Sequence, residues 1–300
     1  MGAEMITTGQ RRRAVIVYRR TELEELLDRH VTRGQVEFFL KTRGRTLGSV
    51  QARHDAITKA RHDLVSGIPD SWAIAQVERE DLSRFLFAPE DNVVVVGQDG
   101  LVANVAKYLS GQLVIGVDPL PGENAGVLVR HSPADGVNLL VNPGTALVGE
   151  LTTVQALTDS NQMLIGLNEV YIGHSSHQSA RYTLRVPSGQ ERQSSSGIIV
   201  GTGTGATGWC SSLAHDRSIT ALPDLTDDTL AWFVREAWPS PSTGVYLTSG
   251  LLEPSETLTV SVESDELVVF GDGMESDRVR VTWGQEILVT RSETPVRLAL

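Results

Sequence analysis

The turn at residues 97–100, Gly-Gln-Asp-Gly, combines residue types that bind phosphate with one that can act on a hydroxyl group. It lies between an apolar run at 93–96 and an amphipathic segment that begins at Leu101. A strand that delivers a glycine-flanked turn to a helix N-terminus presents unpaired backbone N–H groups, which suit phosphate oxygens. Asp99 in such a turn can orient an attacking hydroxyl group, accept its proton or help to hold a magnesium ion. Spacing alone leaves open a plainer interpretation, in which the glycines make a tight turn and Asp99 caps the helix.

Two later segments also carry polar groups at places where a chain can approach a ligand. Asn168 and Glu169 stand side by side within an apolar stretch. Neighbouring side chains of a regular strand point to opposite faces, so both can serve one ligand only if the strand ends or bulges there. Residues 201–208 interleave threonines with glycines, which brings hydroxyl groups and bare backbone together. The alternatives are an ordinary turn at a strand end for the first segment and a mobile glycine hinge for the second.

Other constellations are weaker. His174 and His177 could hold a metal ion, but this spacing outside a helix is more typical of a polar loop. Cys210 could act as a nucleophile with His215, although a buried structural thiol is the simpler interpretation. The chain contains no Gly-x-Ser-x-Gly elbow, no Walker lysine motif and no His-Glu-x-x-His motif.

Length and composition restrict the class of protein. Three hundred residues with 40% hydrophobic content can bury a sizeable core and favour two domains. The 26 basic and 37 acidic side chains give a net charge of -11, which argues against a nucleic-acid binder that works through a basic surface. A single cysteine is compatible with a reducing compartment, and no segment is long and apolar enough for a membrane span, so we expect a cytoplasmic protein without a membrane partner.

The pattern of elements changes along the chain. Before residue 145, strand-like and helix-like segments alternate, which is typical of a parallel sheet with helices on its faces. After it, short β-branched segments separated by turn residues indicate a β-sandwich-like domain, with one helix expected at 227–237. We therefore predict an α/β N-terminal domain at 1–145 and a β-rich domain at 146–284, with a tail at about 285–300 that can return to the first domain.

Four motifs taken together resemble one family, and the first of them consists of two consecutive segments. The segments VVVVGQDGLVANVAKYL and QLVIGVDPLPGENAGVL, followed by GLNEVYIG, SSSGIIVGTGTGATGW and VVFGDGM, are similar to the NAD kinase family. That family has a Gly-Gly-Asp-Gly turn after a strand, a Gly-Asn-x-Gly-like loop, an Asn-Glu motif, a Thr-Pro-Thr-Gly-Ser-Thr-Ala-Tyr segment and a late Asp-Gly turn. The motifs stand in the family's order and cover roughly residues 90–290.

The resemblance implies an NAD kinase-like two-domain architecture and an activity. The family transfers the γ-phosphoryl group of ATP, or of polyphosphate, to the ribose 2′-hydroxyl group of NAD with Mg²⁺ or another divalent cation. Carried over by motif, Asp99 would act on the accepting hydroxyl group, and Gly97 and Gly100 would admit phosphates. The residues implied to bind NAD are Asn168, Glu169, Ser196, Thr204, Gly205, Thr207 and Trp209. The resemblance also implies a homo-oligomer.

Five positions depart from the family pattern. They are Gln98 for the second glycine, Leu101 for a threonine, Ser196 for an aspartate, Gly203 for a proline and Trp209 for a tyrosine. These changes leave both the phosphoryl donor and the acceptor open. The alternatives are a related kinase that acts on another nucleoside, sugar or lipid hydroxyl group, and a non-catalytic regulator that binds NAD or NADP.

Overall fold

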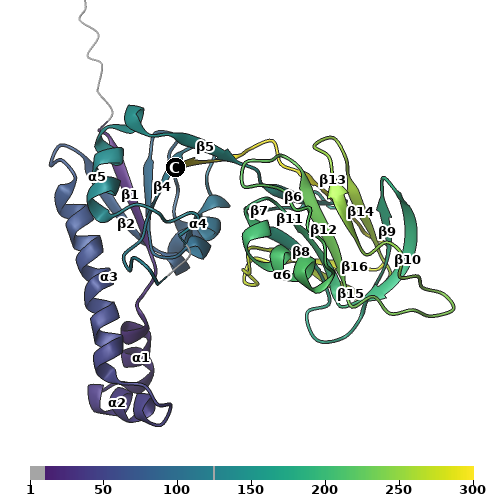
Figure 1. Ribbon diagram of the computed structural model, residues 1–300, viewed down its shortest axis with the longest axis horizontal. Helices are drawn as coiled ribbons and strands as arrows, with labels where there is room; N and C mark the ends of the chain where they lie inside the picture. Colours follow the sequence, from purple (N-terminus) through teal and green to yellow (C-terminus); the bar gives the residue numbers. More distant parts are fainter. Residues whose placement is uncertain (1–10, 124–125) are drawn as a thin grey trace, which may run out of the picture. The chain divides into compact units, whose positions relative to one another are not determined.

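The computed structural model describes residues 11–123 and 126–300, and they fall into two compact units. The first unit contains the chain up to residue 108 together with 112–148 and 298–300. The second contains 109–111 and 149–297. The first unit is an α/β structure and the second is built from antiparallel sheets, so the predicted combination of an α/β region with a β-rich region is confirmed (Figure 1).

A six-stranded sheet forms the centre of the first unit, and its strand order reverses beside β1. From β1 the chain passes through helices to β2 on one side and then crosses to β3 on the other. The pairs β1–β2, β1–β3 and β3–β4 are parallel, so the carboxyl ends of these strands share one edge. Open α/β sheets bind ligands at that edge where the order reverses. In spatial order the strands are β2 (Ala73–Glu78), β1 (Arg13–Tyr18), β3 (Asn92–Val96), β4 (Leu113–Val117), β18 (Val296–Ala299) and β5 (Val148–Leu151); residues 149–151 and 296–297 of the last two are counted with the second unit.

Most of the helices in this unit begin at a residue whose side chain caps the first turn. Thr21 and Glu24 form a capping box, in which each side chain accepts the other residue's backbone N–H. The first two helices pack against one end of α3 around a small apolar core of their own, seen at the lower end of Figure 1. The helical elements are α1 (Glu22–His30), α2 (Arg33–Lys41), α3 (Leu47–Gly67), η1 (Arg79–Arg84), α4 (Asp99–Ala106), α5 (Pro133–Val141) and η2 (Pro143–Thr145).

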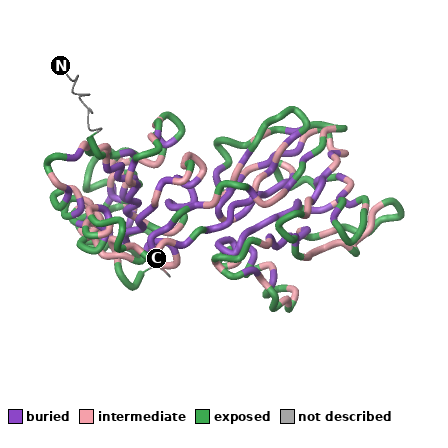
Figure 2. The backbone as a smooth tube through the Cα atoms, turned by 90° about the horizontal axis from the view of Figure 1, so that it is seen from above, coloured by how far each residue is buried: buried purple, intermediate pink, exposed green. Residues whose placement is uncertain are grey.

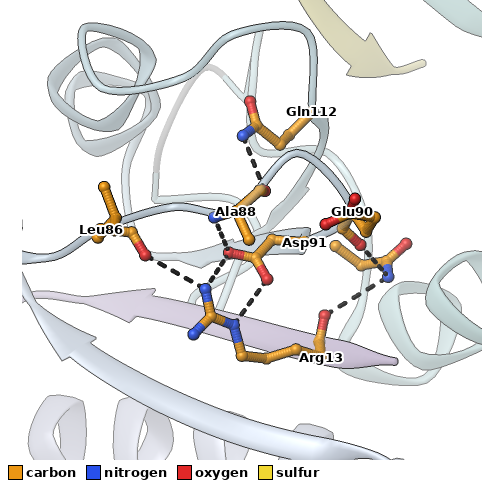
Figure 3. A network of polar contacts seen from close by, with 7 residues as sticks. Arg13, Leu86, Ala88, Glu90, Asp91 and Gln112 are labelled. Atoms are coloured by element: carbon orange, nitrogen blue, oxygen red, sulfur yellow. Dashed lines mark hydrogen bonds and ion pairs between the residues drawn. The ribbon is translucent and has the colours of Figure 1, made fainter. Parts of the chain in front are cut away.

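The buried carboxylate of Asp91 ties together the amino ends of the parallel strands (Figure 3). Its two oxygens accept hydrogen bonds from Nε and Nη2 of Arg13, at 2.7 and 2.6 Å, and one also accepts the Ala88 N–H. The amide of Gln112, just before β4, donates to the Ala88 carbonyl. This network stands at the start of β1, β3 and β4, so the opposite edge of the sheet remains for the turns that follow these strands.

Two six-stranded antiparallel sheets make up the second unit, with one apolar core lined by alternate residues of both. Figure 2 shows the backbone coloured by burial, with exposed residues concentrated along the outer parts of the tube. One sheet runs β10 (Gly189–Ser195), β9 (Ala180–Val186), β14 (Leu258–Val262), β17 (Glu286–Arg291), β6 (Val154–Thr158), β7 (Met163–Gly166). The other runs β13 (Ser249–Leu252), β12 (Leu230–Arg235), β11 (Gly197–Gly201), β8 (Glu169–Gly173), β15 (Glu266–Gly271), β16 (Val279–Thr282). The helical elements η3 (Gly205–Thr207) and α6 (Trp209–Asp216) follow β11.

The prediction of a helix at 227–237 is wrong, because residues 230–235 form strand β12. Its residues Leu-Ala-Trp-Phe-Val are all buried, since β12 pairs with β11 on one side and β13 on the other. A short apolar run of this kind does not distinguish a buried strand from a buried helix by periodicity. Among the described residues, no helix combines the length and apolarity needed to cross a membrane.

Candidate functional site

The Gly-Gln-Asp-Gly turn lies at the carboxyl edge of the parallel sheet, between β3 and α4. The Gly97 N–H donates to the Val117 carbonyl at 3.1 Å, which ties the turn to the end of the neighbouring strand β4. Gln98 occupies the N-cap position of α4, is exposed and makes no side-chain cap bond. Asp99 is the first residue of the helix. The plainer interpretation of the sequence held that Asp99 caps α4. The structure differs, because Gln98 and not Asp99 occupies the N-cap position.

The Asp99 carboxylate binds three consecutive backbone N–H groups of the segment 127–129. Oδ2 accepts from Val127 at 3.0 Å, and Oδ1 accepts from Leu128 and Val129 at 2.9 Å each. An ionised carboxylate offers about four lone-pair directions. One direction on Oδ2 therefore carries no hydrogen bond from the described residues, and the other three hold a loop of the first unit in place.

The two glycines of this turn have different reasons for being glycine. A Cβ added to Gly97 would lie 3.1 Å from Cδ2 of Leu101, so close packing against that buried leucine favours glycine. A Cβ on Gly100 would meet no described atom within 4 Å, and its backbone needs no positive φ. A glycine inside a helix costs about 1 kcal/mol relative to alanine. The fold therefore gives no reason for Gly100, whereas a ligand close to the backbone would.

In the second unit, the chain turns between β7 and β8 at Leu167 and Asn168. Strand β7 ends at Gly166 and β8 begins at Glu169, so the apolar stretch that contains Asn168 and Glu169 is not one continuous strand. This break is the condition under which Asn168 and Glu169 can serve one ligand. Glu169 is buried, and Asn168 is partly exposed. We call residues 167–169 the Asn-Glu turn.

Asp272 holds the Asn-Glu turn in the same way that Asp99 holds 127–129. Its carboxylate accepts the backbone N–H groups of Leu167 at 2.9 Å, Asn168 at 2.7 Å and Glu169 at 3.3 Å. Asp272 and Gly273 both have positive φ, and the Met274 N–H closes the turn on the Gly271 carbonyl. Asp-Gly is a preferred pair for such a turn because both residues tolerate this conformation. Asp272 was not among the predicted site residues; the second glycine-flanked Asp-Gly pair, in Gly-Asp-Gly at 271–273, was the signal that could have found it.

The threonine and glycine segment after β11 packs against the Asn-Glu turn. The Thr202 N–H donates to the Asn168 carbonyl at 2.9 Å, and its hydroxyl group donates to the Leu167 carbonyl at 2.5 Å. The same hydroxyl oxygen accepts from the N–H groups of Thr204 and Gly205. A Cβ on Gly205 would lie 2.2 Å from the Asn168 carbonyl oxygen. These contacts favour a tightly packed segment over a mobile hinge.

Thr204 carries a polar atom that the fold does not satisfy. Its residue is 3% exposed, and its Oγ1 is buried with no hydrogen-bond partner among the described residues. Leaving a buried hydroxyl group unpaired costs roughly 1–3 kcal/mol. Buried unpaired groups are rare in folded proteins and indicate either strain or a missing partner. Thr204 also lies in the segment that contacts Asn168, so the missing partner can be a ligand of that turn.

The remaining predicted residues are distributed along β11 and α6. The Thr207 hydroxyl group donates to the Thr204 carbonyl at 2.8 Å, so Thr207 supports the same segment. Trp209 stacks on Tyr171, with ring centroids 6.0 Å apart, and Arg235 lies 5.4 Å from its ring. Ser196 precedes β11, whereas Thr204 follows it, and five strand residues span about 17 Å. The structure therefore does not bring Ser196 to the Asn-Glu turn.

The lower-ranked candidates find little support. Cys210 is fully buried, and burial raises the pKa of its thiol to about 12, which makes it a poor nucleophile at neutral pH. His174 Nδ1 accepts hydrogen bonds from Ser176. No group of three or more His, Cys, Asp or Glu side chains suited to a metal ion occurs among the described residues. The Gly-Asn-x-Gly-like loop includes residues 124 and 125, which lie outside them.

Neither a family model nor a curated protein matches this chain in comparisons with known proteins.

Proposed function

We propose that this protein is a phosphotransferase similar to the NAD kinases, which transfers the γ-phosphoryl group of ATP or polyphosphate to the ribose 2′-hydroxyl group of NAD. In this reaction the bond between the terminal phosphorus and its bridging oxygen breaks, and a bond to the ribose oxygen forms. The hydroxyl proton is released, and ADP or a shortened polyphosphate leaves. The proposal rests on the order of the motifs and on the two turns that Asp99 and Asp272 organise.

The single observation that supports nucleotide binding most directly is the unpaired hydroxyl group of Thr204. The resemblance assigns this position to the nucleotide. Its neighbours Asn168 and Glu169 are displayed at a strand break that Asp272 fixes. A nucleotide would reach Oγ1 of Thr204 once this side chain turns toward the Asn-Glu turn, and it would then satisfy the one buried side-chain atom of the segment that has no partner among the described residues.

In the first unit, the proposed role of Asp99 is to orient the accepting hydroxyl group and to receive its proton. The remaining lone-pair direction on Oδ2 is sufficient for one hydrogen bond from a hydroxyl group. The three backbone N–H groups hold the carboxylate rigidly, which is the positioning that phosphoryl transfer requires. The open backbone at Gly100 would allow a phosphate to approach the start of α4.

The residues do not form a protein cage for Mg²⁺. The carboxylate of Asp99 is largely committed to backbone N–H groups, and the described residues contain no cluster of metal-binding side chains. Magnesium in phosphoryl-transfer sites commonly keeps waters and binds substrate phosphates, with only one or two carboxylates. A divalent cation would therefore reach this protein bound to its phosphate donor.

The test compares wild type with Thr204→Val, which has the same shape without the hydroxyl group. We expect Thr204→Val to unfold at a higher temperature, because it removes a buried unpaired group worth roughly 1–3 kcal/mol. We expect NAD affinity, measured by calorimetry, and NADP formation from ATP or polyphosphate to fall about tenfold or more. Unchanged NAD binding in the stabilised variant would contradict the nucleotide role of Thr204. Ser212→Ala, at an exposed position of α6, serves as the control.

One observation favours a second candidate, a non-catalytic regulator that binds NAD or NADP. Asp99 has an evident structural role in holding 127–129, so its presence does not require catalysis. A protein that binds NAD but forms no NADP from either donor would support this candidate. In that case, consumption of ATP with another nucleoside, sugar or lipid would identify a related kinase instead.

A further inference from the structure

A pocket of about 280 Å³ in the first unit is lined only by charged residues. Its volume lies just below the range for drug-sized ligand sites, roughly 300–1,000 Å³. No aliphatic or aromatic residue contributes to its wall. The lining consists of Arg19, Arg20, Glu25, Arg29, Glu78, Arg79 and Glu80, and we call it the arginine pocket.

The arginine pocket lies at the carboxyl edge of the parallel sheet. Arg19 and Arg20 directly follow β1, and Arg79 directly follows β2; Tyr18 and Glu78, the last residues of these strands, are register partners. Nε of Arg79 donates to the Asn104 side chain of α4 at 2.7 Å. Asn104 is five residues from Asp99, which is about 8 Å of helix rise. The pocket is thus attached to the helix that begins with the Gly-Gln-Asp-Gly turn.

Two of the four arginines lack a carboxylate partner. Arg19 pairs with Glu25 at 3.5 Å and Arg20 with Asp28 at 2.6 Å, both as partly exposed ion pairs. Among the described residues, Arg79 bonds only to a neutral amide, and Arg29 forms no ion pair. The carboxylate of Glu78 is engaged in turn by the Glu80 N–H. The lining thus carries four arginines against three glutamates, a net charge of +1, and among the described residues Arg29 and Arg79 belong to no ion pair.

This chemistry selects a phosphate chain over a nucleoside. Guanidinium groups bind phosphate oxygens in bidentate fashion, and several of them can follow successive phosphates. Stacking of a base requires an aromatic or apolar wall, which the lining lacks. Exposed ion pairs such as Arg19–Glu25 contribute little free energy, so a multiply charged phosphate can displace Glu25.

We propose that the arginine pocket binds the condensed phosphate chain of the phosphoryl donor, through Arg19, Arg20, Arg29 and Arg79. The identification of this chain as the donor rests on the proposed function; the binding of the anion does not. Two sources share the chemistry, namely the triphosphate part of ATP and inorganic polyphosphate.

The test measures binding of inorganic tripolyphosphate to the full chain by calorimetry. We expect Arg29→Gln and Arg19→Gln each to weaken binding roughly tenfold or more, because each loses a charge-assisted contact. Arg33→Gln, on α2 outside the pocket, removes the same charge and serves as the control. Glu25→Gln should tighten binding a few-fold, because it removes a competing carboxylate from Arg19. Such an increase would not result from a damaged fold.

Equal tripolyphosphate affinity in wild type, Arg29→Gln and Arg19→Gln would overturn the proposal, as would absence of binding to wild type. If ATP affinity falls in Arg29→Gln by the same factor, the pocket holds the nucleotide's phosphates; if only tripolyphosphate affinity falls, it serves polyphosphate. NADP formation, measured in parallel, separates the hypothesis of a phosphate-binding arginine pocket from the hypothesis of kinase activity. Wild type that forms NADP without binding tripolyphosphate refutes the pocket alone, whereas arginine-dependent binding without NADP formation refutes the kinase alone.

Discussion

Replacement of Asp99 by asparagine should loosen the loop at 127–129 as well as affect any chemistry. The asparagine carbonyl oxygen can keep the bonds from Leu128 and Val129, now without the charge. Its amide NH₂ group would then face the Val127 N–H, where two donors meet. An unpaired backbone N–H costs roughly 1–3 kcal/mol, and loss of the charge weakens the two other bonds. The expected decrease in the free energy of unfolding is therefore about 2–4 kcal/mol.

Hydrogen exchange measured by mass spectrometry is the suitable assay, because it reports on the amides of one short segment at a time. A loss of about 2–4 kcal/mol in local stability corresponds to roughly 30- to 1,000-fold less protection of the amides at 127–129. Urea unfolding of the same variant gives the global change. The control is Asp70→Asn, because the exposed Asp70 side chain accepts no hydrogen bond among the described residues. Unchanged protection at 127–129 in Asp99→Asn would refute the structural role of this carboxylate.

The remaining predictions concern Asp272, Cys210 and the Arg13–Asp91 pair. Asp272→Asn should reduce amide protection at 167–169 and weaken NAD binding with it, as measured by hydrogen exchange and calorimetry; unchanged protection would show that the turn is held by other contacts. Cys210 should resist iodoacetamide at pH 8 in the folded protein and react in urea. Because burial raises the folded pKa of Cys210 to about 12, the unfolded thiol ionises first as pH rises above its usual value of about 9, so stability should fall from there upward in urea titrations; a Cys210→Ala variant should lose part of this pH dependence. A double-mutant cycle with Arg13→Gln and Asp91→Asn should give a coupling free energy of about 1–2 kcal/mol, since the pair is bidentate but partly exposed; a value near zero would remove this pair from the forces that fix the sheet.

The sequence predicts the first unit well because its signals are local. The capping box at Thr21 and the uninterrupted apolar run at 93–96 mark a helix start and a buried strand by rules that need no tertiary context. The helix prediction that included residues 230–235 fails for the opposite reason. The identity of this segment as a strand depends on pairing with β11 and β13, which are separated from it by connections of more than ten residues and lie outside any local window.

The candidate site is predictable in composition and much less so in geometry. Glycine and acid types at 97–100 indicate a ligand-binding turn, but nothing local indicates that Asp99 would bind the backbone at 127–129. Asp272 illustrates the same limit, because it lies more than 100 residues from the turn that it holds. Ser196 shows the converse, since a position near the glycine-rich segment in sequence is separated from Thr204 by the length of a strand.

The position of β18 in the first sheet has a consequence for biosynthesis. This strand lies between β4 and β5, yet it is made about 180 residues after β4 leaves the ribosome. At translation rates of roughly 5–20 residues per second, the nascent sheet lacks this strand for about 10–35 s. During that time the edge of β4 is exposed to other chains, and unpaired edges promote aggregation. The first unit to be synthesised is thus among the last to complete its fold, and its yield in cells should depend on chaperones that protect an open sheet.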